Sequence, residues 1–98
     1  MTIEKQLNGE VATLSIAGRL DTQTAPELEK EIDAIVASVK ELTFDMAGLE
    51  YISSAGLRVI LKAQKIMNAQ GSMKLTSVSD AIMEVFDITG FLDILTIE

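Results

Sequence analysis

The sequence of 98 residues contains no cysteine and no histidine. Disulfides, thiolate chemistry, the usual zinc sites and histidine-based acid–base catalysis are therefore excluded. Tryptophan is also absent, and the aromatic residues are one tyrosine and three phenylalanines, so the core must consist mainly of aliphatic side chains and methionine. No apolar run approaches the roughly 18 residues of a transmembrane helix, and no signal peptide is recognisable. These features predict a soluble protein of the cytoplasm.

Basic residues are scarce. Lysine and arginine number 8 against 15 aspartate and glutamate residues, which gives a net charge of -7. Such a surface repels the phosphates of nucleic acids and the headgroups of an anionic membrane, so neither is expected as a partner. A basic protein partner fits this charge, although acidity alone also serves solubility.

The chain is long enough for one domain with one core and too short for two, so residues 1–98 are expected to form a single domain. Alternating apolar residues predict strands, and apolar residues three and four apart predict helices. The expected strands cover 2–7, 11–20, 41–46, 73–78 and 92–97, and the expected helices cover 24–39, 54–70 and 80–90.

This order, β-β-α-β-α-β-α-β, indicates an α/β fold. The sheet is expected to be mixed, to open with an antiparallel hairpin and to carry three helices packed on it. Asn8-Gly9 is a favoured hairpin turn. A capping box over Thr24–Glu27 is expected to begin the first helix, Gly71 to end the second, and Ala47–Glu50 to form a loop.

Two loops are expected to carry function, because loops that lead from parallel strands into helices gather at one edge of a sheet. They are Asp21–Thr24 and Leu49–Ala55. The second leads into Ser53-Ser54-Ala55-Gly56, where free N–H groups and the helix dipole would favour an anion such as a phosphoserine. An ordinary N-cap serine is the simpler interpretation of the same residues.

Catalysis and metal binding have weaker support. The serine loop resembles a nucleophile elbow only loosely, and no histidine can deprotonate a serine, so the protein is not expected to be an enzyme. A metal site of Asp21, Asp45 and Glu50 is conceivable, with Asp45 near the serine loop, but no metal or cofactor is predicted. Asp21 could instead face a partner or begin a turn. Arg58 could hold a phosphate on Ser54, contact a partner or remain solvated.

Three spaced motifs resemble those of one family. Gly18-Arg19-Leu20-Asp21 precedes a helix, Asp45–Leu57 contains the serine loop, and Val85-Phe86 is followed by Gly90-Phe91. In this order they resemble the STAS domain over essentially the whole chain. The family's best-known members are bacterial anti-sigma factor antagonists, also called anti-anti-sigma factors.

The resemblance implies a regulatory partner switch without catalysis and without a cofactor. The unphosphorylated domain would bind an anti-sigma factor that is also a serine kinase. Phosphorylation of a serine in the domain would release that partner, and a metal-dependent phosphatase of the PP2C type would restore the serine.

The resemblance also implies which residues take part. Ser54 is the expected phosphorylation site, with Ser53 in reserve, because the next position is Ala55. The expected partner surface consists of Asp21, Thr22, Ser53, Ser54, Ala55, Gly56 and Arg58. Ala55 also motivates an alternative, a structural STAS subunit of a lipid-transport ABC ATPase or of a signalling complex that phosphorylation does not switch.

Overall fold

The computed structural model describes all 98 residues. Its elements, in chain order, are β1 (Thr2–Asn8), β2 (Val11–Leu20), α1 (Ala25–Ile35), the 3-10 turn η1 (Val36–Ser38), β3 (Glu41–Ile52), α2 (Ser54–Gln70), β4 (Ser72–Thr76), α3 (Asp80–Thr89) and the 3-10 turn η2 (Phe91–Asp93).

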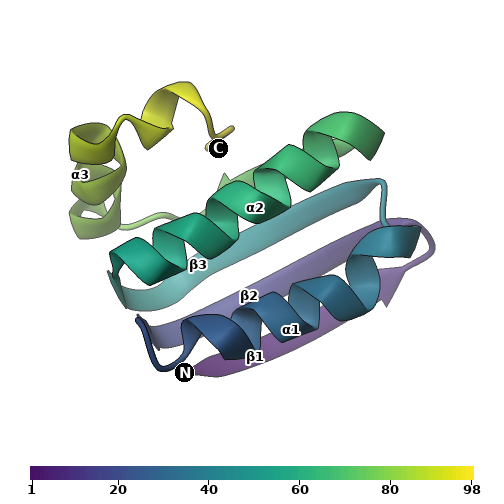
Figure 1. Ribbon diagram of the computed structural model, residues 1–98, viewed down its shortest axis with the longest axis horizontal. Coiled ribbons are helices and arrows are strands. Elements are labelled where there is room, and N and C mark those ends of the chain that lie inside the picture. Colours follow the sequence, from purple (N-terminus) through teal and green to yellow (C-terminus); the bar gives the residue numbers. More distant parts are fainter.

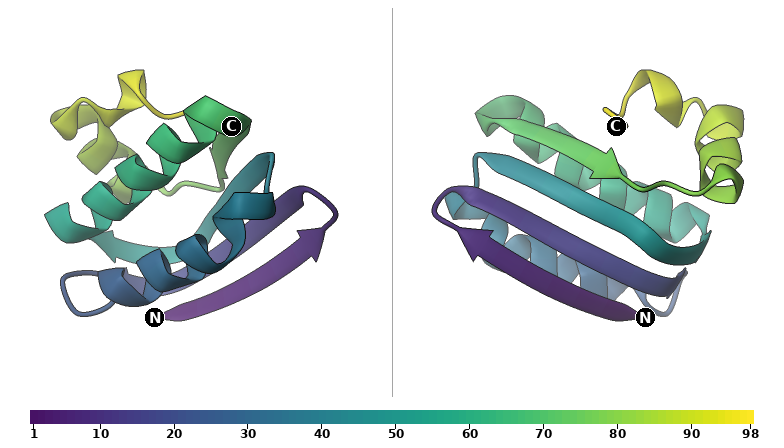
Figure 2. Two further views of the ribbon diagram at one scale, coloured as in Figure 1. Left: turned by 45° about the vertical axis from the view of Figure 1, so that its right-hand side comes forward. Right: turned by 180° about the vertical axis from the view of Figure 1, so that it is seen from behind.

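The four strands form one mixed sheet in the order β1-β2-β3-β4. β1 pairs antiparallel with β2, while β2, β3 and β4 run parallel. α1 and α2 lie side by side over one face of this sheet, and the view from behind shows the other face uncovered (Figures 1 and 2). The predicted α/β fold with its opening hairpin is confirmed, except that α3 lies beyond the end of the sheet rather than over its face (Figure 1).

The core fills the space between the sheet and the two helices. Strand residues alternate between the two faces, so every second residue of β2 enters the core; α1 and α2 contribute apolar residues three and four apart. The fully buried large side chains come from every element except β1 and the two 3-10 turns: Leu14, Ile16, Leu20, Leu28, Ile32, Phe44, Met46, Ile60, Met67, Leu75, Ile82 and Phe86. The core is therefore mainly aliphatic, as the scarcity of aromatic residues predicts.

β3 is longer than the sequence predicts, and the loop expected over Ala47–Glu50 is wrong. Shifts in the pairing of β3 with β2 give β3 one extra residue at two places, after Asp45 and after Leu49. Such bulges change the spacing of inward residues from two to three, and Met46, Leu49 and Ile52 are all buried. The lost alternation explains why this stretch reads as a loop in the sequence.

The closing strand expected over 92–97 is also wrong. Phe91 begins the turn η2 and stacks on Phe86 with ring centroids 6.4 Å apart. The chain then returns beside β4 and makes a single parallel bridge, between Leu75 and Ile97. Anchoring of Phe91 and of the buried Leu95 in the core shapes this segment more strongly than its β-favouring residues do.

Gly71 ends α2 as predicted, but for a different reason. Its φ of -179° is extended backbone, so the left-handed conformation of a typical C-cap glycine is not used. A Cβ atom at this position would lie 1.8 Å from the carbonyl oxygen of Lys40. Glycine is needed because the backbone of the turn before β3 passes directly against it.

Candidate functional site

The two loops predicted to carry function meet at the carboxyl edge of the parallel strands. β2 ends at Leu20 and β3 at Ile52, and these two residues are paired. The backbone N–H of Ser53 donates to the carbonyl oxygen of Leu20 at 2.9 Å. The start of α2 therefore lies directly beside the start of the Asp21–Thr24 loop, which confirms that the fold brings these segments together.

The two serines at the start of α2 have different environments. Ser53 is the N-cap, half-buried, and its hydroxyl accepts a hydrogen bond from the N–H of Gly56 at 3.4 Å. Ser54 is the first residue of the helix and is exposed. Its hydroxyl takes part in none of the side-chain hydrogen bonds of the structure, so Ser54 offers the more accessible oxygen.

Ala55 and Gly56 lie on the inner side of α2. Ala55 is partly buried against the core, and Gly56 is buried. A Cβ atom on Gly56 would lie 2.7 Å from Cγ of Leu20 and 3.0 Å from Cγ1 of Ile52. The missing side chain of Gly56 lets α2 approach the sheet, and it thereby fixes where Ser54 stands relative to the neighbouring loop.

Asp21 shapes the turn between β2 and α1. Its Oδ1 accepts hydrogen bonds from the N–H groups of Gln23 at 3.0 Å and Thr24 at 3.1 Å, while Thr24 Oγ1 accepts from the Asp21 N–H at 2.8 Å. The capping box expected over Thr24–Glu27 is wrong, because the N-cap Thr24 makes no side-chain cap hydrogen bond. The reciprocal pair of a capping box lies three residues earlier, between Asp21 and Thr24. The bonds from Thr24 above all lower the pKa of the Asp21 carboxyl, and Thr22 is exposed in the turn.

Arg19 and Tyr51, which were not predicted as individual site residues, lie at the same edge. They are paired across β2 and β3, and the guanidinium carbon of Arg19 lies 4.1 Å from the centre of the Tyr51 ring. Arg19 Nε is also 3.7 Å from Asp21 Oδ2. Both residues are exposed. Arg19 precedes the Asp21–Thr24 loop by two residues and Tyr51 lies within the stretch 49–55, but only the pairing of β2 with β3 brings the two side chains together.

The acidic residues considered for a metal site are not gathered. Asp45 lies in the middle of β3 and not near the serine loop, because the strand continues to Ile52. Its Oδ2 accepts from the Ser15 hydroxyl at 3.4 Å and its Oδ1 from the Ala47 N–H at 3.1 Å. The structure contains no cluster of three or more potential metal-ligating side chains.

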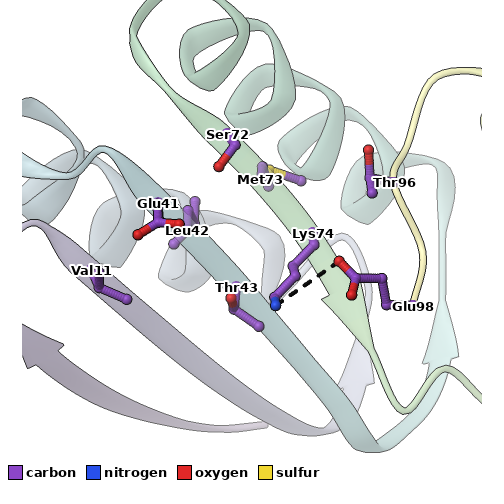
Figure 3. A pocket seen from close by; sticks show the side chains of 9 residues that line it. All are labelled: Val11, Glu41, Leu42, Thr43, Ser72, Met73, Lys74, Thr96 and Glu98. Atoms are coloured by element: carbon purple, nitrogen blue, oxygen red, sulfur yellow. Dashed lines mark ion pairs between the residues drawn. The ribbon is translucent and has the colours of Figure 1, made fainter.

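A hollow of about 300 Å³ lies away from these loops, on the open face near the amino ends of β3 and β4 (Figure 3). Lys74 Nζ and Glu98 Oε2 approach to 3.9 Å across part of it. None of the residues that line it belongs to the site predicted from the sequence. The candidate site is an exposed surface at the strand ends rather than this hollow.

An exposed surface of serine and charged residues at one edge of a mixed sheet is typical of a binding module, and the family follows from comparison. Residues 2–98 match the family model of the STAS domain, so the chain belongs to the STAS domain family. The resemblance inferred from the three sequence motifs is confirmed. No helix of the structure is both long and apolar enough to cross a membrane.

Among its relatives, the anti-sigma-B factor antagonist of Bacillus subtilis is 30% identical over 98 residues, covering 99% of this chain and 90% of that protein. The anti-sigma-B factor antagonist of Listeria monocytogenes is 32% identical over 98 residues, covering 96% of this chain and 84% of its own length. The anti-sigma factor antagonist SpoIIAA in its unphosphorylated form has a similar fold, with a TM-score of 0.85, 17% identity, and coverage of 99% of this chain and 88% of SpoIIAA.

Proposed function

We propose that the protein is an anti-sigma factor antagonist that binds an anti-sigma factor with serine kinase activity and releases it when Ser54 is phosphorylated. The observation that carries the proposal is the exposed Ser54 hydroxyl at the first turn of α2, beside the loop of Asp21. Two relatives that cover nearly the whole chain carry the name anti-sigma-B factor antagonist. SpoIIAA, which has the same fold, also exists in a phosphorylated form.

The structure favours Ser54 over Ser53 as the modified residue. Ser53 uses its hydroxyl to cap α2 and is half-buried, so modification there would remove a helix cap. Ser54 makes no competing hydrogen bond and faces solvent. A phosphate on Ser54 would lie at the positive end of the helix dipole, close to unpaired backbone N–H groups. Phosphorylation would therefore leave the fold of the domain intact.

The switch would act through charge at the centre of the docking surface. A phosphate adds about -1.5 to -2 charges, and burying it against a partner that fits a neutral hydroxyl is strongly unfavourable. A penalty of about 3–4 kcal/mol would weaken binding by two to three orders of magnitude. The domain would bind its partner without catalysing a reaction and without a cofactor. It would act in the cytoplasm, where transcription is controlled, and a PP2C-type phosphatase would remove the phosphate.

The test begins with affinity purification of the protein from its native cell to obtain the partner kinase. The purified kinase is then incubated with ATP and the wild-type, Ser54→Ala or Ser53→Ala protein, and the products are mapped by mass spectrometry. We expect phosphate on Ser54 in the wild type and in Ser53→Ala, and none in Ser54→Ala.

Binding supplies the second measurement. Ser54→Asp should weaken binding of the kinase at least about tenfold, because even one negative charge would be buried. Gln6→Glu, which adds the same charge on exposed β1, is the matched control and should bind as the wild type does. Kinase binding that Ser54→Asp leaves unchanged would contradict control through Ser54. Stable association with an ABC ATPase, insensitive to the same substitution, would instead support a structural subunit.

A further inference from the structure

The cations of this acidic protein are unevenly distributed. α2 carries three of the 8 basic residues, Arg58, Lys62 and Lys65, and none of the 15 acidic ones. By contrast, α3 contains acidic residues and no basic ones. α2 is thus a positively charged element in a protein of net charge -7.

The three cations lie on one exposed side of α2. They are spaced four and three residues apart, so they follow one another along the same helix face, and all three are exposed. The partly buried Leu61 and Ile66 flank this row of cations on its two sides, and together with the cations and Glu29 of α1 they help to line a groove of about 480 Å³. α2 itself lies on the outside of the molecule (Figure 1). The result is a surface with three cations, one carboxylate and apolar side chains beside them.

Only one of the three cations is neutralised within the molecule. Lys62 Nζ lies 3.2 Å from Glu29 Oε2 and 3.4 Å from Asp33 Oδ1, both on α1, and this contact ties the two helices together. Arg58 and Lys65 form none of the ion pairs of the structure. Two strong charges therefore remain available on the same face.

The charges of Arg58 and Lys65 do not serve the stability of α2. Like charges three and four residues apart destabilise a helix, and Arg58 stands near the positive end of the helix dipole. The helix has no acidic side chain that could compensate within its own length. Violations of local electrostatic preference are expected where a residue serves binding. A negatively charged partner would supply the missing counter-charges.

We infer that the outer face of α2 is a docking surface for an acidic, partly apolar surface of the anti-sigma factor. This inference rests on the proposed function and names the chemistry of the partner. At 1.5 Å per residue, Arg58 and Lys65 are roughly 10 Å apart along the axis, so the partner would present carboxylates at a similar spacing. Its apolar side chains would lie against Leu61 and Ile66.

The same arrangement extends the switch. Ser54 is four residues before Arg58, so it lies at the amino end of the cationic face. A phosphate on Ser54 would place negative charge next to Arg58 and would repel the partner's carboxylates. The electrostatic attraction between the two proteins would then be weakened at the amino end of α2, beside the Asp21 loop.

The experiment measures binding of the kinase purified for the phosphorylation test, by isothermal titration calorimetry at low and high salt. The variants are Arg58→Glu, Lys65→Glu and their combination. Lys40→Glu, which reverses an exposed charge in the turn before β3, is the control, and circular dichroism verifies the fold of each variant. We expect the double variant to bind at least about tenfold more weakly, with a smaller salt dependence, and Lys40→Glu to stay within about twofold of the wild type.

Two failures are distinguishable. If the wild type binds the kinase and the double variant binds as tightly as Lys40→Glu, the docking surface on α2 is refuted while the proposed function stands. If the wild type binds no anti-sigma factor, the proposed function is refuted and this inference with it. A matching Glu→Lys or Asp→Lys substitution in the kinase that restores binding of the double variant would support direct contact.

Discussion

At the scale of single residues, the site depends on how each polar side chain is committed. Ser53 and Asp21 hold the two loops in shape through hydrogen bonds to backbone N–H groups. Ser54, Thr22 and Arg58 project into solvent. This difference separates residues that build the surface from residues that a partner can contact. Asp21 belongs to both groups, because its Oδ1 holds the turn while its Oδ2 lies near Arg19.

Asp21→Asn tests the structural part of this role. The pKa of Asp21 is lowered, mainly by the backbone hydrogen bond from Thr24, so its ionised form is favoured in the folded state. A carboxyl with a lowered pKa stabilises the protein above its unfolded pKa, about 3.9, and this stabilisation is lost as the pH falls through the folded pKa. We therefore expect Asp21→Asn to be less stable than the wild type at pH 7, with the difference shrinking as the pH falls below the unfolded pKa.

Urea unfolding at several pH values measures this difference, and a carbon-detected NMR titration follows the Asp21 carboxyl directly. Titration of Asp21 at or above the usual aspartate value would show that the turn does not stabilise its charge.

The residues of the site were predictable to different degrees. Ser53, Ser54 and Asp21 could be selected from the sequence because helix caps and strand ends have strong local signals. Arg19 and Tyr51 could not, because only the pairing of β2 with β3 places the cation over the ring. The packing role of Gly56 was equally hidden, since its contacts with Leu20 and Ile52 join distant segments.

At the scale of elements, α2 connects the core to the surface. Its inner side packs on the sheet through Ile60, Ala63 and Met67, and its outer side carries the exposed cations. The helices were predictable because their apolar spacing is regular, whereas the second half of β3 was not, because two bulges interrupt its alternation. The last segment was misjudged because a single bridge and two anchored apolar side chains shape it.

Two glycines mark the ends of α2, and replacing them should have unequal effects. In Gly71→Ala the new methyl group would overlap the backbone carbonyl of Lys40, so we expect a loss of about 1–3 kcal/mol in the free energy of unfolding. In Gly56→Ala the overlap is with side-chain carbons of Leu20 and Ile52 and not with backbone, and alanine improves helix propensity by up to about 1 kcal/mol. Gly56→Ala should therefore lose less.

Urea unfolding of both variants, fitted with a common m value, gives the two free energies of unfolding to be compared. Each substitution adds one methyl group to a glycine, so each controls for the other. A loss for Gly71→Ala equal to or smaller than that for Gly56→Ala would contradict the close backbone approach at the end of α2.

At the scale of the whole molecule, the fold separates a supporting side from a docking side. The parallel strands bring the Asp21 turn and the start of α2 to one edge, and the acidic residues all lie outside α2. The negative net charge found in the sequence is therefore not a guide to the charge of the partner at this site. A local cationic face in an acidic protein favours one orientation of docking and gives phosphorylation a place to act.

The most direct measurement is the dissociation constant of the partner kinase for the unmodified protein and for the protein phosphorylated on Ser54. Both are measured by isothermal titration calorimetry at one salt concentration, with a non-hydrolysable ATP analogue so that the phosphorylation state does not change. We expect tight binding of the unmodified protein. The phosphorylated protein should bind at least about a hundredfold more weakly. Equal affinities, within about twofold, would show that phosphate on Ser54 does not control the partner.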